Sequence, residues 1–162
     1  LVVMSMAGIA QGAQPLISYY YGQNNWKNCK KLLRYSLMAT GIMALAFFGI
    51  YFIGTRQIIH LFVAKSNHSL VQSSMSLFRI FNFSYLIVGF NIVIGGFFTS
   101  IEKPFQAISI SFMRGFLVIA LCLFGLTWIF GGGGIWWAPI LSETLCLIAS
   151  IIFLKKVLTK RT

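Results

Sequence analysis

The sequence has very few side chains that could take part in acid–base chemistry, and one of them lies in an unusual place. Of 162 residues only two are carboxylates, Glu102 and Glu143. Glu143 falls inside a long apolar segment, where an ionisable group must be paired, protonated or hydrated. We therefore take Glu143 as the first candidate for a functional residue; the alternative is a structural partnership with a hydroxyl or backbone group of the preceding helix. Glu102 stands beside Lys103 and Pro104, and we expect it to be a solvated residue of a turn.

A row of polar side chains near the start of the chain forms a second candidate. Its members are Gln11, Gln14, Ser18 and Tyr21. Their spacing places them on one face of a helix, and amide groups are poorly suited to lipid. This face predicts either a binding surface that contacts water and ligand or a packing seam. Pro15 lies within the row, and we expect it to kink the helix. Gly8 and Gly12 favour close contact with another helix.

Two further segments carry polar groups at apolar positions. Asn82, Tyr85 and Asn91 lie in one of them and are candidates for contacts with a substrate or a cation. Hydrogen bonds between helices explain the two asparagines equally well. Pro139 precedes Glu143 on the same predicted face, and we expect it to kink its helix. The three cysteines are too widely spaced for a zinc motif, so we predict neither a metal site nor a disulfide framework.

The composition indicates what kind of scaffold must hold these residues. The chain is 58% apolar and 9% charged, with a mean hydropathy of +0.84, whereas soluble domains carry about 25% charged residues. Charge-free windows, interrupted by four consecutive glycines at 131–134, predict five membrane-spanning helices. Their ranges are 1–21, 35–54, 75–100, 106–130 and 135–156. The predicted fold class is all-α, a polytopic membrane bundle whose few polar groups face one another.

The same composition argues against several classes of function. Two carboxylates cannot supply the acid pairs or metal cages of most hydrolases, and the hydroxyls lack an acid–base partner, so we do not expect an enzyme. The net charge of +11 comes largely from basic clusters beside apolar segments, as in proteins that contact anionic lipid heads. Because no soluble face carries a basic patch, nucleic acid is not an expected partner. The expected partner is the lipid bilayer.

Lysine and arginine are divided unevenly between alternate connections of the predicted helices. One side carries ten, in segments 22–34 and 101–114 and in the C-terminal tail, and the other carries three, Arg56, Lys65 and Arg79. Such an excess marks the cytoplasmic side of a membrane. We therefore predict a cytoplasmic C-terminus and, with five spans, a first residue at the outer face. The expected location is the plasma membrane of a cell, with the inner membrane of a bacterium as the simplest case.

Several segments resemble one family of transporters. Residues 8–22, GIAQGAQPLISYYYG, resemble the motif on the eighth helix of the multidrug and toxic compound extrusion (MATE) transporters. The likeness continues through the basic cluster at 30–34. Residues 99–114 resemble the family's turn between its tenth and eleventh helices, and residues 139–143 resemble a motif of its twelfth. The resemblance covers essentially the whole chain and identifies it with helices eight to twelve.

The resemblance implies a twelve-helix antiporter of two six-helix lobes. Such a protein exports cationic or amphiphilic drugs in exchange for Na⁺ or H⁺ by alternating access. The chain would be most of the second lobe, its partners would include the missing N-terminal helices of the same protein, and the substrate cavity would lie between the lobes. We expect about seven further spans upstream of Leu1. The resemblance implies no cofactor besides the coupling ion.

Some residues depart from the family pattern, and two other interpretations remain. The family's coupling acids lie on its first helix or on its seventh and tenth, and the segment that resembles the tenth carries Asn82 and Asn91 without a carboxylate. A lipid-linked sugar flippase of the same superfamily would need basic residues inside its cavity to hold a pyrophosphate, whereas lysine and arginine are predicted here at helix ends. The other alternative is an inactive fragment or a membrane scaffold without transport.

Overall fold

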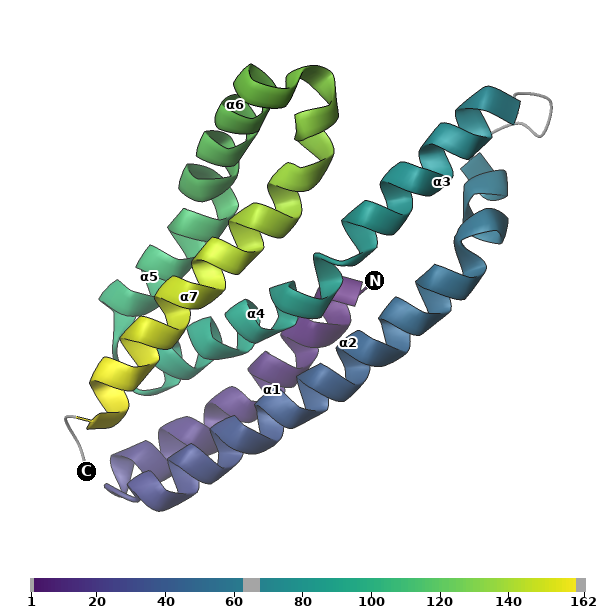
Figure 1. Ribbon diagram of the computed structural model, residues 1–162. Coiled ribbons are helices and arrows are strands. Elements are labelled where there is room, and N and C mark those ends of the chain that lie inside the picture. Colours follow the sequence, from purple (N-terminus) through teal and green to yellow (C-terminus); the bar gives the residue numbers. More distant parts are fainter. Residues whose placement is uncertain (1, 63–67, 160–162) are drawn as a thin grey trace.

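The described residues of the protein form helices and no strand. The computed structural model describes residues 2–62 and 68–159. In chain order its elements are α1 (Val2–Gly22), α2 (Trp26–Phe62), α3 (His68–Asn82), α4 (Tyr85–Ser100), α5 (Pro104–Phe112), the π-helical turn η1 (Met113–Leu117), α6 (Val118–Phe130), the 3₁₀ segment η2 (Gly131–Trp137) and α7 (Ala138–Thr159). Figure 1 shows them as elongated, roughly aligned helices. The prediction of an all-α membrane bundle is confirmed.

Three stretches of the described residues are long and apolar enough to cross a membrane: Trp26–Thr55, Leu77–Ser100 and Pro104–Thr159. The last contains 56 residues and folds back on itself at η2. The outer surface is apolar as well, since Trp128 is 90% exposed and Phe124 is 79% exposed. A soluble protein rarely exposes so much contiguous apolar surface, whereas lipid covers it at no cost. The chain is therefore a multi-pass membrane protein.

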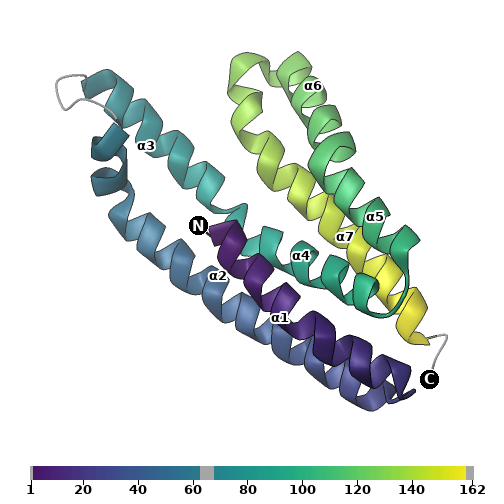
Figure 2. The ribbon, with the colours of Figure 1, turned by 180° about the vertical axis from the view of Figure 1, so that it is seen from behind.

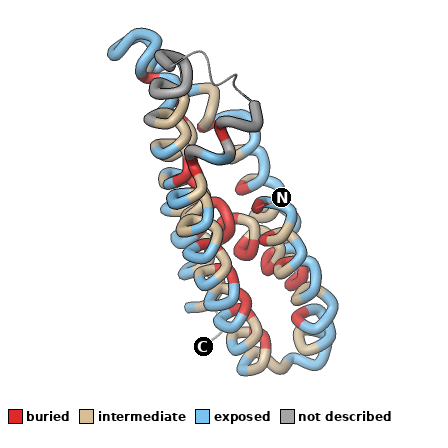
Figure 3. Tube along the Cα trace, turned by 90° about the vertical axis from the view of Figure 1, so that its right-hand side faces the viewer, coloured by how far each residue is buried: buried red, intermediate tan, exposed pale blue. Residues whose placement is uncertain are grey.

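Helix α4 lies at the centre of the molecule. It packs against α1 and α2 on one side and against α5 and α7 on the other, as the opposite views in Figures 1 and 2 show. The largest buried cluster draws on α1, α2, α4 and α5, with partly buried residues of α7 packed against it. Figure 3 shows the buried positions along the inner sides of the helices. The polar residues Asn91 and Ser100 of α4 are accordingly buried.

Two glycines allow the neighbouring helices to approach α4. A Cβ atom added at Gly89 would collide with the side chain of Thr40 on α2 and would lie 2.7 Å from the sulfur of Met6 on α1. Gly96, two turns further along, lies against α1 in the same way. Small residues of this kind let membrane helices pack backbone to backbone. The close contact of α1 with α4 therefore depends on these positions.

The helices differ in length from the predicted spans, for two physical reasons. The segment predicted as one span at 75–100 forms two helices, α3 and α4, with Phe83 and Ser84 between them. Near this break Asn82 donates a hydrogen bond to the carbonyl oxygen of Phe48, at 3.2 Å. Helix α2 has 37 residues, about 55 Å at 1.5 Å per residue, because the flanking basic residues end the apolar window without ending the helix.

The basic segments predicted on one side gather at one end of the molecule. The start of α2, the α4–α5 turn and the end of α7 lie together there, and η2 lies at the opposite end with the tips of α2 and α3 (Figure 1). Both turns at the basic end leave a helix through a left-handed residue, Asn24 with φ 56° and Glu102 with φ 55°. Glu102 is exposed, as expected. Leu1, Lys65, Lys160 and Arg161, which the prediction of sidedness also uses, lie outside the described residues.

The contact at Gly89 generates a first prediction. Gly89→Ala should lower the free energy of unfolding by about 1–3 kcal/mol, because the new methyl group overpacks the junction of α1, α2 and α4. Gly95→Ala is the matched control on the same helix, since a Cβ there meets nothing within 4 Å. The measurement is thermal unfolding of the purified protein in detergent. Equal melting temperatures for the two variants would contradict the packing described here.

Candidate functional site

Two adjacent polar cavities lie where α1, α4, η1 and α7 meet. The first has a volume of about 220 Å³, and the polar residues that line it are Gln11, Gln14, Asn91, Thr99, Ser111 and Arg114. The second has a volume of about 330 Å³, and its polar lining consists of Ser84, Tyr85, Arg114, Ser142 and Glu143. Arg114 lines both cavities, so they form one polar region inside an apolar bundle.

Asn91 is the hub of the hydrogen bonds in this region. Its side-chain Nδ2 donates to the carboxylate Oε2 of Glu143 at 2.8 Å and to the backbone oxygen of Glu143 at 3.0 Å. Its Oδ1 accepts a hydrogen bond from Ser150 Oγ at 3.1 Å. Asn91 is 1% exposed and Ser150 is fully buried. The three bonds join α4 to α7 and hold the Glu143 carboxylate at the edge of the second cavity.

Helix α1 supplies the two glutamines of the first cavity. Gln11 and Gln14 both line it, as expected for a polar face turned away from lipid. A Cβ atom at Gly96 would lie 3.2 Å from Gln14 Nε2 and 3.3 Å from the Cβ of Ala10. The absence of a side chain at Gly96 therefore gives the Gln14 amide its place beside α4. Pro15 lies inside the continuous helix α1, close to both glutamines.

Arg114 lines both polar cavities, a position that was not predicted for it. Its charge is grouped with segment 101–114 on the predicted cytoplasmic side, although the predicted span 106–130 contains it, whereas the structure places Arg114 on both cavities. A signal for this position exists in the sequence, because the apolar residues Ile110, Val118 and Cys122 stand at four-residue steps in register with Arg114; the structure buries all three. Such steps drift by about 40° each around a regular α-helix. The wider π-helical turn η1 offsets that drift and keeps Arg114 on the inward stripe.

Three of the predicted site residues contribute to packing instead of lining the two cavities. Ser18 Oγ donates to the carbonyl oxygen of Ser100 at 3.2 Å and so joins α1 to α4. Tyr21 packs edge-on against Trp26, with ring centroids 5.5 Å apart. Asn82 is bonded to α2 at the α3–α4 break. These three residues therefore make the contacts described and line neither polar cavity.

The remaining predicted residues lie in or beside the second cavity. Tyr85 and Pro139 both contribute to its lining, together with Glu143. Pro139 stands at the second position of α7, where a proline needs no hydrogen-bond partner for its nitrogen. It therefore begins the helix after η2, and the kink predicted there is replaced by a helix start.

The two cavities contain one positive and one negative side chain among the residues that the structure describes, Arg114 and Glu143. Amide and hydroxyl groups make up the rest of the polar lining. Within the same described part of the chain, no group of three or more histidine, cysteine or acidic residues is placed to hold a metal ion. The region can therefore offer a carboxylate, amide oxygens and an aromatic hydroxyl to a ligand in a partly apolar space.

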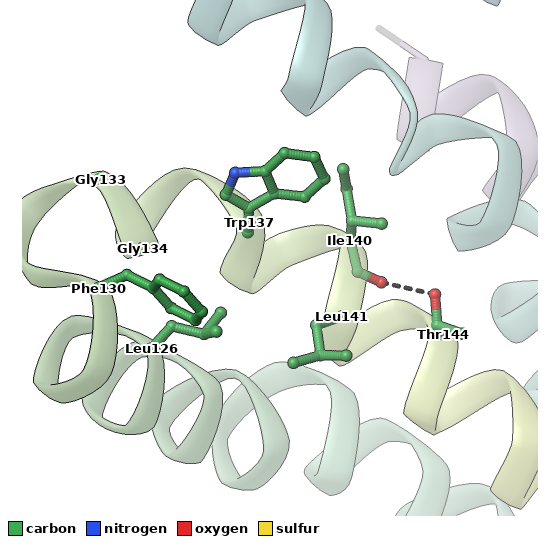
Figure 4. A pocket seen from close by; sticks show the side chains of 8 residues that line it. All are labelled: Leu126, Phe130, Gly133, Gly134, Trp137, Ile140, Leu141 and Thr144. Atoms are coloured by element: carbon green, nitrogen blue, oxygen red, sulfur yellow. Dashed lines mark hydrogen bonds between the residues drawn. The ribbon is translucent and has the colours of Figure 1, made fainter.

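A larger cavity of about 670 Å³ lies between α6 and α7 below η2, and its chemistry is different. Figure 4 shows that its walls are almost wholly apolar, with Phe130 and Trp137 on its sides. Its one side-chain hydroxyl, on Thr144, donates to the carbonyl oxygen of Ile140 at 2.7 Å. Besides this hydroxyl, the indole N–H of Trp137 is the one polar side-chain group among the described residues that line the cavity, so the polar region is the better candidate for specific recognition.

The hydrogen bonds of Asn91 generate a second prediction. Asn91→Ala should lower the free energy of unfolding by about 1–3 kcal/mol, because it leaves Ser150 Oγ and Glu143 without their partner in a buried site. Ser150→Ala should cost less, and the two changes should not add. Thermal unfolding in detergent measures both. Thr99→Ala is the control, since Thr99 bonds only within its own helix; an equal effect of Asn91→Ala and Thr99→Ala would contradict the network.

Comparison with known proteins places the chain in a family. The MatE family model matches residues 1–124. The chain is similar to the multidrug export protein MepA of Staphylococcus aureus strain NCTC 8325 / PS 47, with 22% identity over 152 residues, 94% of this chain and 32% of that protein. MepA of strain bovine RF122 / ET3-1 gives 22% identity over 153 residues with the same coverage. The chain thus spans about a third of the length of these relatives, and no solved structure gives a significant match. Because the family model covers most of its residues, the chain belongs to the MatE family of membrane proteins.

Proposed function

We propose that the protein containing this chain is a secondary active multidrug exporter. It exports cationic or amphiphilic compounds in exchange for Na⁺ or H⁺ by alternating access, and this chain supplies part of its second lobe. The relatives named above are multidrug export proteins, and the family membership supports the same role here. The observation that carries the proposal is the polar region, which presents the Glu143 carboxylate beside Tyr85 inside an apolar bundle.

The chemistry of this region suits an amphiphilic cation. A carboxylate attracts a positive charge most strongly where water is scarce, and aromatic rings bind both cations and apolar surface. Gln11 and Gln14 add hydrogen-bonding groups on the α1 side. We assign Glu143 to recognition of the cation, Tyr85 to its apolar part and the two glutamines to orientation.

The flippase interpretation is less well supported by the same residues. A pyrophosphate carries two or more negative charges and needs several cationic groups around it. Arg114 is the one basic residue among the described residues that line the polar cavities, and Glu143 lines the second cavity with it. The region therefore has no excess of positive charge with which to hold such a group. The interpretation as an inactive scaffold is tested by the efflux measurement that follows.

A third prediction concerns efflux. Cells that lack their main drug exporters and express the protein from its complete gene should accumulate less ethidium than cells with an empty vector. Glu143→Gln should reduce the efflux rate by about tenfold, since a carboxylate interaction of this kind contributes about 1.4 kcal/mol, and Gln14→Ala should reduce it less. Glu102→Gln is the matched control, because Glu102 is exposed at a turn. If both cavity variants pumped normally, the assigned site would be wrong; if the unaltered protein did not pump, the function itself would be wrong.

A fourth prediction concerns orientation. We place the basic end of the bundle in the cytoplasm, as the excess of lysine and arginine there suggests. The native cysteines Cys29, Cys122 and Cys146 are buried, so a membrane-impermeant maleimide should label them weakly. A cysteine introduced at Lys156 should react only in inside-out vesicles, and one introduced at Gly132 only in intact cells. Reaction of the Lys156 variant in intact cells would reverse the proposed orientation.

A further inference from the structure

Arg114 is a permanent charge inside a stretch of the chain long and apolar enough to cross a membrane. An arginine at the centre of a bilayer is costly to insert. Such a residue is normally retained only if it faces a polar cavity and has a counter-charge nearby. Here Arg114 is half-buried and lines both polar cavities, and Glu143 is the one acidic group among the described residues that line them.

The two charged groups share a cavity without forming a direct ion pair among the described residues. The Glu143 carboxylate is held by Asn91 Nδ2 at 2.8 Å, and Asn91 is fixed in turn by Ser150. The carboxylate therefore has a fixed position on α7. The guanidinium belongs to a different element, η1, and ends a long and flexible side chain. The Glu143 carboxylate is thus held by hydrogen bonds, whereas the distance from it to the Arg114 guanidinium can change with the rotamer of the arginine.

The backbone around Arg114 is compatible with such movement. Residues Met113–Leu117 form a π-helical turn between α5 and α6, a feature that often marks functional positions in helices. The next residue, Gly115, also lines the second cavity, and a Cβ there would meet nothing within 4 Å. The side chain of Arg114 thus stands on a wide turn with open space beside it.

We propose that Arg114 is a resident counter-ion of Glu143 that competes with cationic ligands for this carboxylate. When the cavity is empty, the guanidinium balances the negative charge. When a monovalent cation binds at Glu143, the guanidinium moves away and the balance is kept. Arg114 thereby limits how tightly cations are held and leaves neutral ligands unaffected. This inference rests on the proposed function, because it assigns a selectivity to the same site.

Replacement of Arg114 would change cation affinity in opposite directions if Arg114 were a counter-ion of Glu143 and if it only supported the fold. A residue that only supports the fold would weaken every ligand when replaced. An internal competitor strengthens cation binding when it is removed, and only while its partner carboxylate is present. The effects of Arg114 and Glu143 on cation affinity must then depend on each other, which a double-mutant cycle measures.

The experiment measures the affinity of the purified full-length protein in lipid nanodiscs for two fluorescent probes, the monocation ethidium and the neutral dye Nile red. Arg114→Gln should bind ethidium about tenfold more tightly, as expected for removal of one charge from a partly hydrated cavity. Nile red binding should stay the same. Arg114→Lys keeps the charge and should stay near the unaltered protein. Arg79→Gln is the matched control, since Arg79 is exposed and lies over the Phe52 ring on the α2–α3 hairpin.

A second set of variants combines Arg114→Gln with Glu143→Gln. Glu143→Gln should bind ethidium more weakly, and Arg114→Gln added to it should cause no further change. The proposal is overturned if Arg114→Gln leaves ethidium affinity unchanged or lowers it, if it changes Nile red binding equally, or if its effect persists in the Glu143→Gln background. Failure of the unaltered protein to bind ethidium would refute the proposed function itself. If the unaltered protein bound and exported ethidium normally but Arg114→Gln left ethidium affinity unchanged, this inference alone would be refuted.

Discussion

A polar group buried between helices in a membrane gains no hydrogen bond from lipid, so it needs a partner within the protein. Asn91 meets this requirement fully, because both ends of its amide are bonded to α7. The same bonds fix the Glu143 carboxylate and tie the central helix to the second hairpin. Two buried atoms in the described part of the chain, Thr40 Oγ1 and Asn82 Oδ1, have no partner. Neither residue is among those that line the two polar cavities.

The position of α4 makes this arrangement possible. Glycines on α4 let α1 approach on one side, while α7 packs on another. Because α1 and α7 reach α4 from different directions, the polar faces of three helices meet at one level of the bundle. The π-helical turn η1 then adds Arg114 to the same region. The polar side chains of the candidate site therefore come from α1, α4, α5, η1 and α7 and from the turn before α4.

The charges in the polar region distinguish it from the apolar cavity between α6 and α7. That cavity is larger, yet its described lining residues carry no charge and offer a ligand mainly contact area. The polar region is smaller and combines a carboxylate with a guanidinium, amides and a tyrosine. Under the function proposed here, a site of this composition would discriminate ligands by charge, because a carboxylate and a guanidinium line the same cavity. Apolar contact alone provides much weaker discrimination between ligands of similar size.

The sequence by itself determined the class of the protein and several members of its site. Its hydropathy requires lipid, its polar spacing puts Gln11 and Gln14 on an inward face, and a lone acid in an apolar segment singles out Glu143. Only the tertiary structure decided which polar residues meet. Periodicity is a local property, so it cannot tell that Asn91 bonds to Glu143 across 52 positions while Ser18 and Asn82 are used for packing. Nor can periodicity show that Arg114 lines the polar cavities, because that position depends on the π-helical turn η1 and on its packing against α7.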